Sequence, residues 1–379
     1  MKITGVRVQL CHFPLPEMFS PSWFPGFPQM TNGCAIYRLQ TDEGLEGVTA
    51  GPLIADEAKG LVNLLRLVLT GRDPTQVEDI FKLLRSATRA LGLRAWHLEP
   101  ACWDLIGKAA GLPVWRLLGG ATERIRAYAS TGELREPKHR ADDALALREQ
   151  GFTAVKLRIR FPTIEEDLAV VRAVREAVPD MPIMVDANQG WRVHGFADYP
   201  EWDLSRAVRT ARGLEELDVT WLEEPLDQFD YRGYAELRGR TTVALAAGEM
   251  LSDLHGFRDM VEHRAVDILQ PDAVLTGGIL MARKVSAMAE AAGMGFAPHT
   301  WTNGIGLRIN LQVMGSVPNA EWCEYPIDPP GWTVDARDAM LAEPTTIDPD
   351  GYVTLPEAPG LGIELDEERI AAHGEEIPA

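Results

Sequence analysis

The chain has 379 residues, 46% hydrophobic and 25% charged, a composition typical of globular proteins. Its formal net charge of −19 argues against nucleic acid as a partner, because so acidic a surface repels phosphate backbones. The four cysteines lack CxxC spacing, and we find neither a signal peptide nor an apolar run of membrane-spanning length. We therefore expect a soluble cytoplasmic protein without a zinc cluster or a membrane partner.

The first 120 residues divide into a β-rich part and a helical part. Residues 3–10 alternate as in a strand, a Pro- and aromatic-rich loop covers 19–30, and two strand-like runs flank a turn at 41–44. Residues 57–71 and 99–111 show helical spacing, and each run ends at a glycine, a common helix stop. Strands followed by helices predict a separate α+β domain.

From about residue 125, short β-rich runs alternate with amphipathic helical runs. The predicted strands are 125–130, 153–159, 182–187, 219–225, 243–249, 265–272, 293–299 and 320–326. Eight βα-type repeats over roughly 200 residues predict a parallel α/β barrel of the TIM type. We expect an N-terminal domain over 1–122, a barrel over 123–330, and a C-terminal segment over 331–379 that returns to the N-terminal domain.

Ionisable side chains recur at the C-terminal ends of seven consecutive predicted strands, where a barrel places its active site. In chain order they are Lys156 and Arg158, Asp186, Glu223 and Glu224, Glu249, Asp272, His299 and Glu324. Any one alone is more simply explained as a helix cap, a solvated turn or a structural histidine. Capping does not require carboxylates on three successive strands, and Asp186, Glu223 and Glu249 supply three hard oxygen ligands, a set that suits Mg²⁺.

The run AVKLRIR, residues 154–160, alternates aliphatic and cationic side chains. A period of two places the aliphatic residues toward the surrounding helices and Lys156 and Arg158 toward the barrel mouth. We expect Arg160 in the loop that follows. Two cations at the mouth are suited to binding a substrate carboxylate.

With these residues the sequence resembles the enolase superfamily, and within it the mandelate racemase group of acid-sugar dehydratases and racemases. The resemblance covers essentially the whole chain and rests on VDANQGW, WLEEP, GE, QPD, PH and EWCEYP as a set. It implies a modified (β/α)8 barrel of (β/α)7β form, with an α+β capping domain completed by the C-terminal tail, in a homo-oligomer. It also implies Mg²⁺ ligation by Asp186, Glu223 and Glu249, a base dyad of Asp272 and His299, and Glu324 as the electrophile opposite. The muconate-lactonizing group instead has a lysine after strand six, which QPDAVLTGG lacks.

One departure from the family bears on the reaction. Racemases of this group carry Lys-x-Lys on strand two, whereas this chain has Lys156-x-Arg158. Arginine stays protonated at ordinary pH, so it binds carboxylates or hydroxyls well and accepts protons poorly. We therefore favour one-base β-elimination through His299 over two-base racemisation, with Lys156 as the alternative base.

Two segments are candidates for covering the site. The loop at 20–30 offers Trp23, Phe24 and Phe27 for excluding water, and it contains no cation for a second carboxylate. The connection GWRVHGFADYPEWD is long, and it is either a surface excursion or a second lid that brings Arg192 or His194 to the substrate. Asn188, just before it, is a further candidate substrate contact.

These residues predict a Mg²⁺-dependent dehydratase of an acid sugar, a small carboxylate substrate, giving a 2-keto-3-deoxy acid. The alternative enzyme is a racemase or epimerase of a 2-hydroxy or amino acid. A non-catalytic, ligand-binding barrel is less favoured, because such a protein has no reason to keep ligands, dyad and electrophile together.

Overall fold

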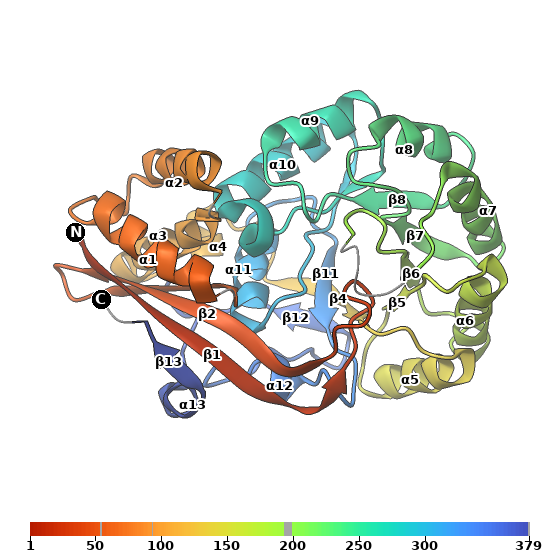
Figure 1. The fold of residues 1–379 in the computed structure, drawn as a ribbon, viewed down its shortest axis with the longest axis horizontal. Coiled ribbons are helices and arrows are strands. Elements are labelled where there is room, and N and C mark those ends of the chain that lie inside the picture. Colours follow the sequence, from red (N-terminus) through yellow and green to blue (C-terminus); the bar gives the residue numbers. More distant parts are fainter. Residues whose placement is uncertain (54, 93, 193–198, 378–379) are drawn as a thin grey trace.

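The computed structural model describes residues 1–53, 55–92, 94–192 and 199–377, which form an N-terminal α+β domain, an α/β barrel and a tail that contacts both (Figure 1). The N-terminus and the last described residues of the chain lie on the same side of the molecule, next to the N-terminal sheet (Figure 1). Within these residues no helix combines the length and the apolarity needed to cross a membrane.

The N-terminal domain is an antiparallel sheet covered by helices. Its strands are β1 (Ile3–Phe19), β2 (Gln29–Thr41) and β3 (Glu46–Pro52), in this order in the sheet. The strand β13 (Gly374–Glu376), from the C-terminal tail, pairs with the outer side of β1. Its helices are α1 (Ala55–Leu69), α2 (Val77–Leu91), the short turn η1 (Trp96–Leu98), α3 (Glu99–Ala110) and α4 (Val114–Leu117). The predicted stop after 99–111 is confirmed, because Gly111 takes a left-handed φ of 66° and its N–H bonds back to the last turn of α3.

The barrel strands are all parallel and fall at the eight predicted positions. They are β4 (Arg124–Ser130), β5 (Val155–Arg158), β6 (Ile183–Asp186), β7 (Val219–Glu223), β8 (Ala244–Ala247), β9 (Ile268–Leu269), β10 (Gly295–Phe296) and β11 (Trp322–Pro326). The sheet order β10-β9-β8-β7-β6-β5-β4-β11 follows the chain, and a parallel bridge between Phe296 and Ala320 joins the two ends. The predicted TIM-type barrel is thus confirmed.

Helices surround the strands on the outside of the barrel (Figure 1). They are α5 (Pro137–Glu149), α6 (Ile164–Ala177), α7 (Leu204–Glu215), α8 (Tyr231–Arg238), α9 (Leu254–Glu262), α10 (Gly278–Ala292) and α11 (Gly304–Gly315), with a single π-type turn η2 (Ala273–Gly277) before α10. Local capping sets their starts: Thr163 and Glu166 form a reciprocal capping box on α6, and Asp203 caps α7.

The C-terminal tail contains α12 (Val334–Arg337), β12 (Tyr352–Thr354), α13 (Glu367–His373) and β13 (Gly374–Glu376). β12 pairs with the first barrel strand, β4, and β13 pairs with β1 of the N-terminal sheet. The tail therefore ties the two domains together and does not contact the N-terminal domain alone.

Two further contacts place the N-terminal domain over the barrel mouth. Glu99 of α3 accepts hydrogen bonds from the backbone N–H groups of Ile279 and Leu280, at 2.7 and 3.0 Å, and so caps the start of α10. On another side of the mouth, the loop between β1 and β2 is held through Ser22, whose backbone N–H donates to the carbonyl of Gly132 at 2.9 Å. The space between the domains is therefore bounded on more than one side.

Candidate active site

A cavity of about 490 Å³ lies between the N-terminal domain and the barrel mouth. The barrel contributes charged and polar lining residues at strand ends, namely Arg158, Asn188, Glu249 and His299. The predicted lid contributes Trp23, Phe24 and Phe27. A cavity of this size, apolar on one wall with few convergent polar groups on the other, is typical of a small-molecule site.

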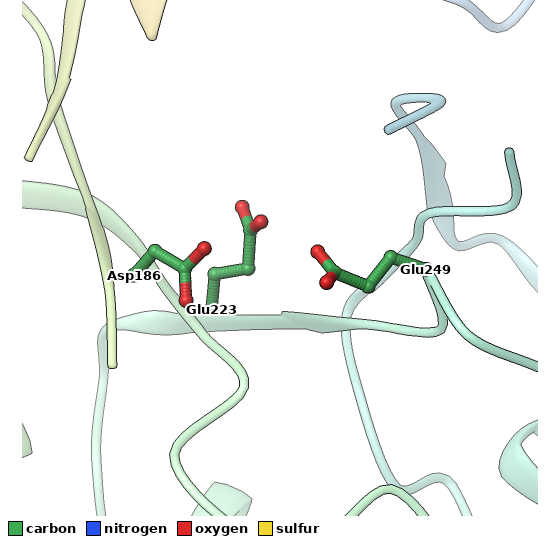
Figure 2. Close-up of side chains that lie close together, drawn as sticks. All are labelled: Asp186, Glu223 and Glu249. Carbon is green, nitrogen blue, oxygen red and sulfur yellow. The ribbon is translucent and has the colours of Figure 1, made fainter. Parts of the chain in front are cut away.

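Three carboxylates converge inside this mouth, at the C-terminal ends of successive strands. Asp186 and Glu223 end the neighbouring strands β6 and β7, Glu249 follows β8, and all three are buried. One oxygen from each lies within 4.8 Å of the others, and the Glu249 side chain faces the other two from the opposite side (Figure 2). The Glu249 Oε2 atom accepts no hydrogen bond within the described structure. Buried, converging carboxylates with an unused oxygen fit a hard divalent cation, so these residues are suited to hold Mg²⁺.

Lys156 lies between two carboxylates inside the barrel. Its Nζ atom is 2.6 Å from Glu223 Oε1 and 2.7 Å from Glu324 Oε1, and the side chain is fully buried. Burial lowers the pKa of Lys156, but the charges of Glu223 and Glu324 outweigh it and hold the pKa above its ordinary range. In this arrangement Lys156 is a charged partner of two acids.

Arg158, two residues further along β5, lines the cavity and is held rigidly. Its Nη1 atom donates to Asp186, and its Nε donates to the carbonyl of Thr131 at 2.7 Å. The rings of Trp23 and Trp301 lie 5.1 and 5.8 Å from the guanidinium carbon. The alternation predicted for strand two therefore places a fixed cation at the mouth, next to a candidate metal ligand.

His299 and Asp272 form the predicted neighbouring pair. The Nδ1 atom of His299 lies 2.9 Å from Asp272 Oδ2, and its Nε2 lies 3.3 Å from Glu249 Oε2. The other oxygen of Asp272 accepts two backbone N–H groups at the start of η2, at 2.6 and 3.0 Å, so this residue is also a helix cap. Burial lowers the pKa of His299, but Glu249, Glu324 and Asp272 raise it to about 10.

Glu324 at the end of β11 is surrounded by hydrogen-bond donors. Its Oε1 accepts from the hydroxyl of Ser130 at 2.7 Å, and its Oε2 accepts from the backbone N–H of Thr300 at 2.7 Å. Together with Lys156, these groups make Glu324 an acceptor in the present arrangement. The role of Glu324 as the electrophile stays a prediction.

The substrate contacts predicted in and near the long connection after β6 do not all line the cavity. Asn188 lines the cavity and donates its side-chain amide to Asp186 at 3.0 Å. Arg192 pairs with Glu201 at 2.7 Å and is not among the described residues that line the cavity. His194 lies outside the described residues. Arg160 lies just past β5, as expected, and donates to a backbone carbonyl of the lid at 2.8 Å.

Several supporting residues escaped the sequence reading. Trp191 donates its indole N–H to Glu249 Oε1 at 2.6 Å, and Gln270 donates to Glu223 Oε2 at 2.8 Å, so each orients a candidate ligand. Trp191 lies in the motif VDANQGW and Gln270 lies in the motif QPD, so these motifs could have pointed to both residues. Asn310 of α11 donates to the carbonyl of His299 at 3.1 Å, and no motif marks it.

Glu224, next to the candidate ligand Glu223, is a further buried carboxylate and not part of a solvated turn. It adopts a left-handed φ of 45°, and neither of its carboxyl oxygens has a hydrogen-bond partner within the described structure. Burial and the nearby charge of Glu249 raise the pKa of Glu224. Carboxylates outnumber cations in this part of the barrel, which further suits it to a bound metal ion.

Comparison with known proteins assigns the fold and the motifs to a family. Residues 28–119 match the N-terminal domain of mandelate racemase / muconate lactonizing enzymes, and residues 139–369 match the enolase C-terminal domain-like model. The chain belongs to the mandelate racemase / muconate lactonizing enzyme family. The resemblance predicted from the strand-end motifs is therefore confirmed.

Members of this family similar to the chain include acid-sugar enzymes. A D-galactarolactone cycloisomerase from Agrobacterium fabrum is 32% identical, with 98% of each chain covered. An L-talarate/galactarate dehydratase from Salmonella typhimurium is 30% identical over 88% of this chain and 80% of that one. The crystal structure of L-talarate dehydratase from Polaromonas sp. JS666, complexed with Mg and L-glucarate, matches with a TM-score of 0.84 and 29% identity, covering 100% of this chain and 99% of that one.

Proposed function

We propose that this protein is a Mg²⁺-dependent acid-sugar dehydratase. It removes the proton next to the substrate carboxylate, eliminates the β-hydroxyl as water, and yields a 2-keto-3-deoxy acid. The observation that carries the proposal is an asymmetry across the barrel mouth. His299, paired with Asp272, lines one side of the cavity, whereas the opposite side presents Arg158, which cannot serve as a base.

The order of the strands makes the two sides opposite. In the ring of eight strands, β5, which carries Arg158, is three strands away from β10, which His299 follows, and four away from β9, which Asp272 follows. A substrate between them meets a proton acceptor on one face and a permanent cation on the other. Lys156, the remaining candidate base, is buried between Glu223 and Glu324 and does not line the cavity among the described residues. This arrangement supports one-base chemistry.

The carboxylates at the centre of the mouth would hold the metal. Asp186, Glu223 and Glu249 provide the ligand set, and Trp191 and Gln270 orient it. A bound Mg²⁺ supplies positive charge beside the substrate carboxylate and so stabilises the negative charge that develops when the α-proton leaves. If Glu249 served as a ligand, its charge would raise the pKa of His299 less, which would favour the neutral imidazole that the base needs.

His299 then performs both proton transfers. Asp272 accepts a hydrogen bond from the Nδ1–H group and thereby fixes Nε2 as the site that takes the α-proton. The electron pair of the broken C–H bond forms a carbon–carbon double bond as the β C–O bond breaks. The proton on Nε2 goes to the departing hydroxyl, which leaves as water, and the resulting enol tautomerises to the keto acid. The aromatic side chains of the lid exclude bulk water during these steps.

A cycloisomerase is the second candidate function. The D-galactarolactone cycloisomerase covers 98% of this chain at 32% identity, more of the chain than the talarate/galactarate dehydratase covers. Elimination of a ring oxygen instead of a hydroxyl would use the same base. The two activities differ in the product, because cycloisomerisation keeps the mass of the substrate and dehydration removes one water.

The test is a screen of acid sugars and their lactones with the protein and MgCl₂ in D₂O, analysed by mass spectrometry and a keto-acid assay. A keto acid lighter than the substrate by one water supports dehydration. An isomer of unchanged mass favours the cycloisomerase, and α-deuteration without a keto acid favours racemisation or epimerisation. Full turnover after exhaustive chelation would contradict the role of Mg²⁺.

A further inference from the structure

The lid loop is bonded to the barrel through Ser22, whose polar groups reach three separate segments. Its backbone N–H donates to the carbonyl of Gly132 at 2.9 Å, and its own carbonyl accepts from Arg160 Nη1 at 2.8 Å. Its hydroxyl donates to the side-chain carbonyl of Asn188 at 2.6 Å. Ser22 is buried, and the aromatic residues that follow it in the loop line the cavity. This serine is therefore a fixed point of the lid.

Asn188 connects this fixed point to a candidate metal ligand. Its side-chain amide donates to Asp186 Oδ2 at 3.0 Å, and its backbone N–H donates to Asp186 Oδ1 at 2.7 Å. Asn188 is buried and adopts a left-handed φ of 46°, which asparagine tolerates better than most residues. Both oxygens of the Asp186 carboxylate are thus oriented by Asn188, and the hydroxyl of Ser22 fixes the amide of Asn188.

A second lid residue, Phe24, makes an apolar contact of the same kind. Its ring meets the ring of Trp191 nearly edge to face, with centroids 5.6 Å apart and an angle of 70° between the planes. Trp191 in turn donates to Glu249 Oε1 at 2.6 Å. Two residues of the lid therefore reach two different members of the candidate metal triad, each through one intermediate residue of the run VDANQGW.

We propose that Ser22 is a positioning residue that couples the lid to the metal site. Its hydroxyl holds Asn188, and Asn188 holds Asp186 in the orientation that suits a metal ligand. Coupling between two sites is reciprocal, so the observed lid position strengthens metal binding by the same factor by which metal binding favours that lid position. The inference rests on the metal site of the proposed function and not on the reaction.

Calorimetric titration of the metal-free full chain with MgCl₂ measures the coupling at the metal. The variants are Ser22→Ala, Asn188→Gly and the double variant, with glycine at 188 because it tolerates a left-handed φ. Ser20→Ala is the matched control, because it removes the same group from the same loop. The side chain of Ser20 is exposed and makes no hydrogen bond within the described residues, and the backbone N–H that donates to Glu133 is kept.

Ser22→Ala should raise the Kd for Mg²⁺ by roughly 2- to 10-fold, the size of one net hydrogen bond. Asn188→Gly should raise it by roughly 10- to 100-fold, as is typical for a partner that orients a metal ligand. The double variant should bind no more weakly than Asn188→Gly, because Ser22 acts through Asn188, and Ser20→Ala should match the wild type. Wild-type affinity in Ser22→Ala, or losses that add in the double variant, would overturn the proposal.

Hydrogen–deuterium exchange of residues 20–30 measures the same coupling from the lid. Adding Mg²⁺ should slow exchange of these amides in the wild type and in Ser20→Ala, and much less in Ser22→Ala and Asn188→Gly. Equal slowing in all four proteins would overturn the inference alone, and a wild type that binds no Mg²⁺ would overturn both the inference and the role of the metal in the proposed function. Coupling in a protein that gives no keto acid from any acid sugar would support the inference, while the dehydratase assignment fails.

Discussion

The same strands carry two layers of side chains in the barrel interior, and the two layers differ in polarity. The lower layer, which we term the apolar floor, consists of Tyr128, Ala154, Met184, Trp221 and Ala246. The layer above it, which we term the charged layer, contains Ser130, Lys156, Asp186 and Glu223, each two residues further along a strand of the floor. Inward-facing positions recur every second residue along a strand. On each of these strands, an apolar side chain that packs the barrel is therefore followed, two residues later, by a polar or charged side chain at the mouth.

The two layers also depend on each other. In the floor, the rings of Tyr128 and Trp221 meet edge to face with centroids 5.4 Å apart, and this packing closes the barrel below the charges. The Trp221 indole N–H reaches up to Glu223 Oε2 at 3.1 Å. Apolar packing in the lower layer stabilises the barrel near the N-terminal ends of the strands. The buried charges near the C-terminal ends stabilise the fold poorly without a ligand. Four predictions test this division.

The largest expected effect comes from removing the base in the upper part of the barrel. We expect His299→Asn to lower kcat by at least roughly 10²- to 10⁴-fold and to abolish α-proton exchange, while the melting temperature stays within a few degrees of the wild type. Turnover and deuterium exchange by NMR are the measurements, with Met184→Leu in the floor as a matched control that keeps activity. Exchange that survives in His299→Asn would show that another residue is the base, with Lys156 as the candidate.

The second prediction concerns the apolar floor, where a substitution should affect stability more than the chemistry. Trp221→Ala should destabilise the protein by about 3–5 kcal/mol, because a large buried ring leaves a cavity that its neighbours fill only in part. Trp221→Phe keeps most of the ring volume and loses the N–H donated to Glu223, so it should cost less stability and lower activity more than it lowers the melting temperature. Denaturant unfolding gives the free energies. A Trp221→Ala variant as stable as the wild type would contradict the role of the floor.

The third prediction concerns the cation that lines the cavity. Arg158→Lys keeps the charge but loses the planar fork, so dehydration should weaken by roughly 10- to 1,000-fold, as for a charge-assisted contact. A lysine there also restores the Lys-x-Lys pair, and exchange on the second face of the substrate should become detectable. The stereochemistry of deuterium incorporation is the readout. Wild-type protein that exchanges both α-epimers at comparable rates would favour the racemase alternative.

The smallest expected effect is on stability and follows from the surplus of carboxylates in the charged layer. Mg²⁺ at about 100 times its Kd should stabilise the folded chain by about 2.7 kcal/mol, and EDTA should reverse the gain. The melting temperature with and without the metal measures it. Glu249→Gln, which removes one ligand of the triad, should show a much smaller shift. An equal shift in this variant would place the metal elsewhere.

Local patterns account for what could be predicted. The eight strands and the glycine that ends α3 depend on neighbours within a few residues, so periodicity and helix-stop residues reveal them. The strand-end residues Asp186, Glu223 and Glu249 were predictable for the same reason. Once consecutive strands are parallel, their C-terminal ends must meet at one mouth.

Other features of the site depend on segments far apart in the chain. Trp96 of the N-terminal domain docks on η2, about 180 residues away, and Asn310 supports His299 from a different helix. Periodicity carries no information about such contacts. Arg192 lies near Asp186 in the sequence and its guanidinium pairs with Glu201 in the structure, so its contact with a substrate stays a prediction.

The sequence by itself thus determined the barrel, its mouth and the kinds of groups that gather there, because each follows from the spacing of residues along single strands and helices. Only the tertiary structure decided which of these groups face the cavity. Lys156 and Arg158 lie on the same face of β5, yet Lys156 is buried between Glu223 and Glu324 while Arg158 lines the cavity. The physical reason is that the depth of a side chain in the barrel, and the partners available at that depth, depend on the neighbouring strands and on the domain above them.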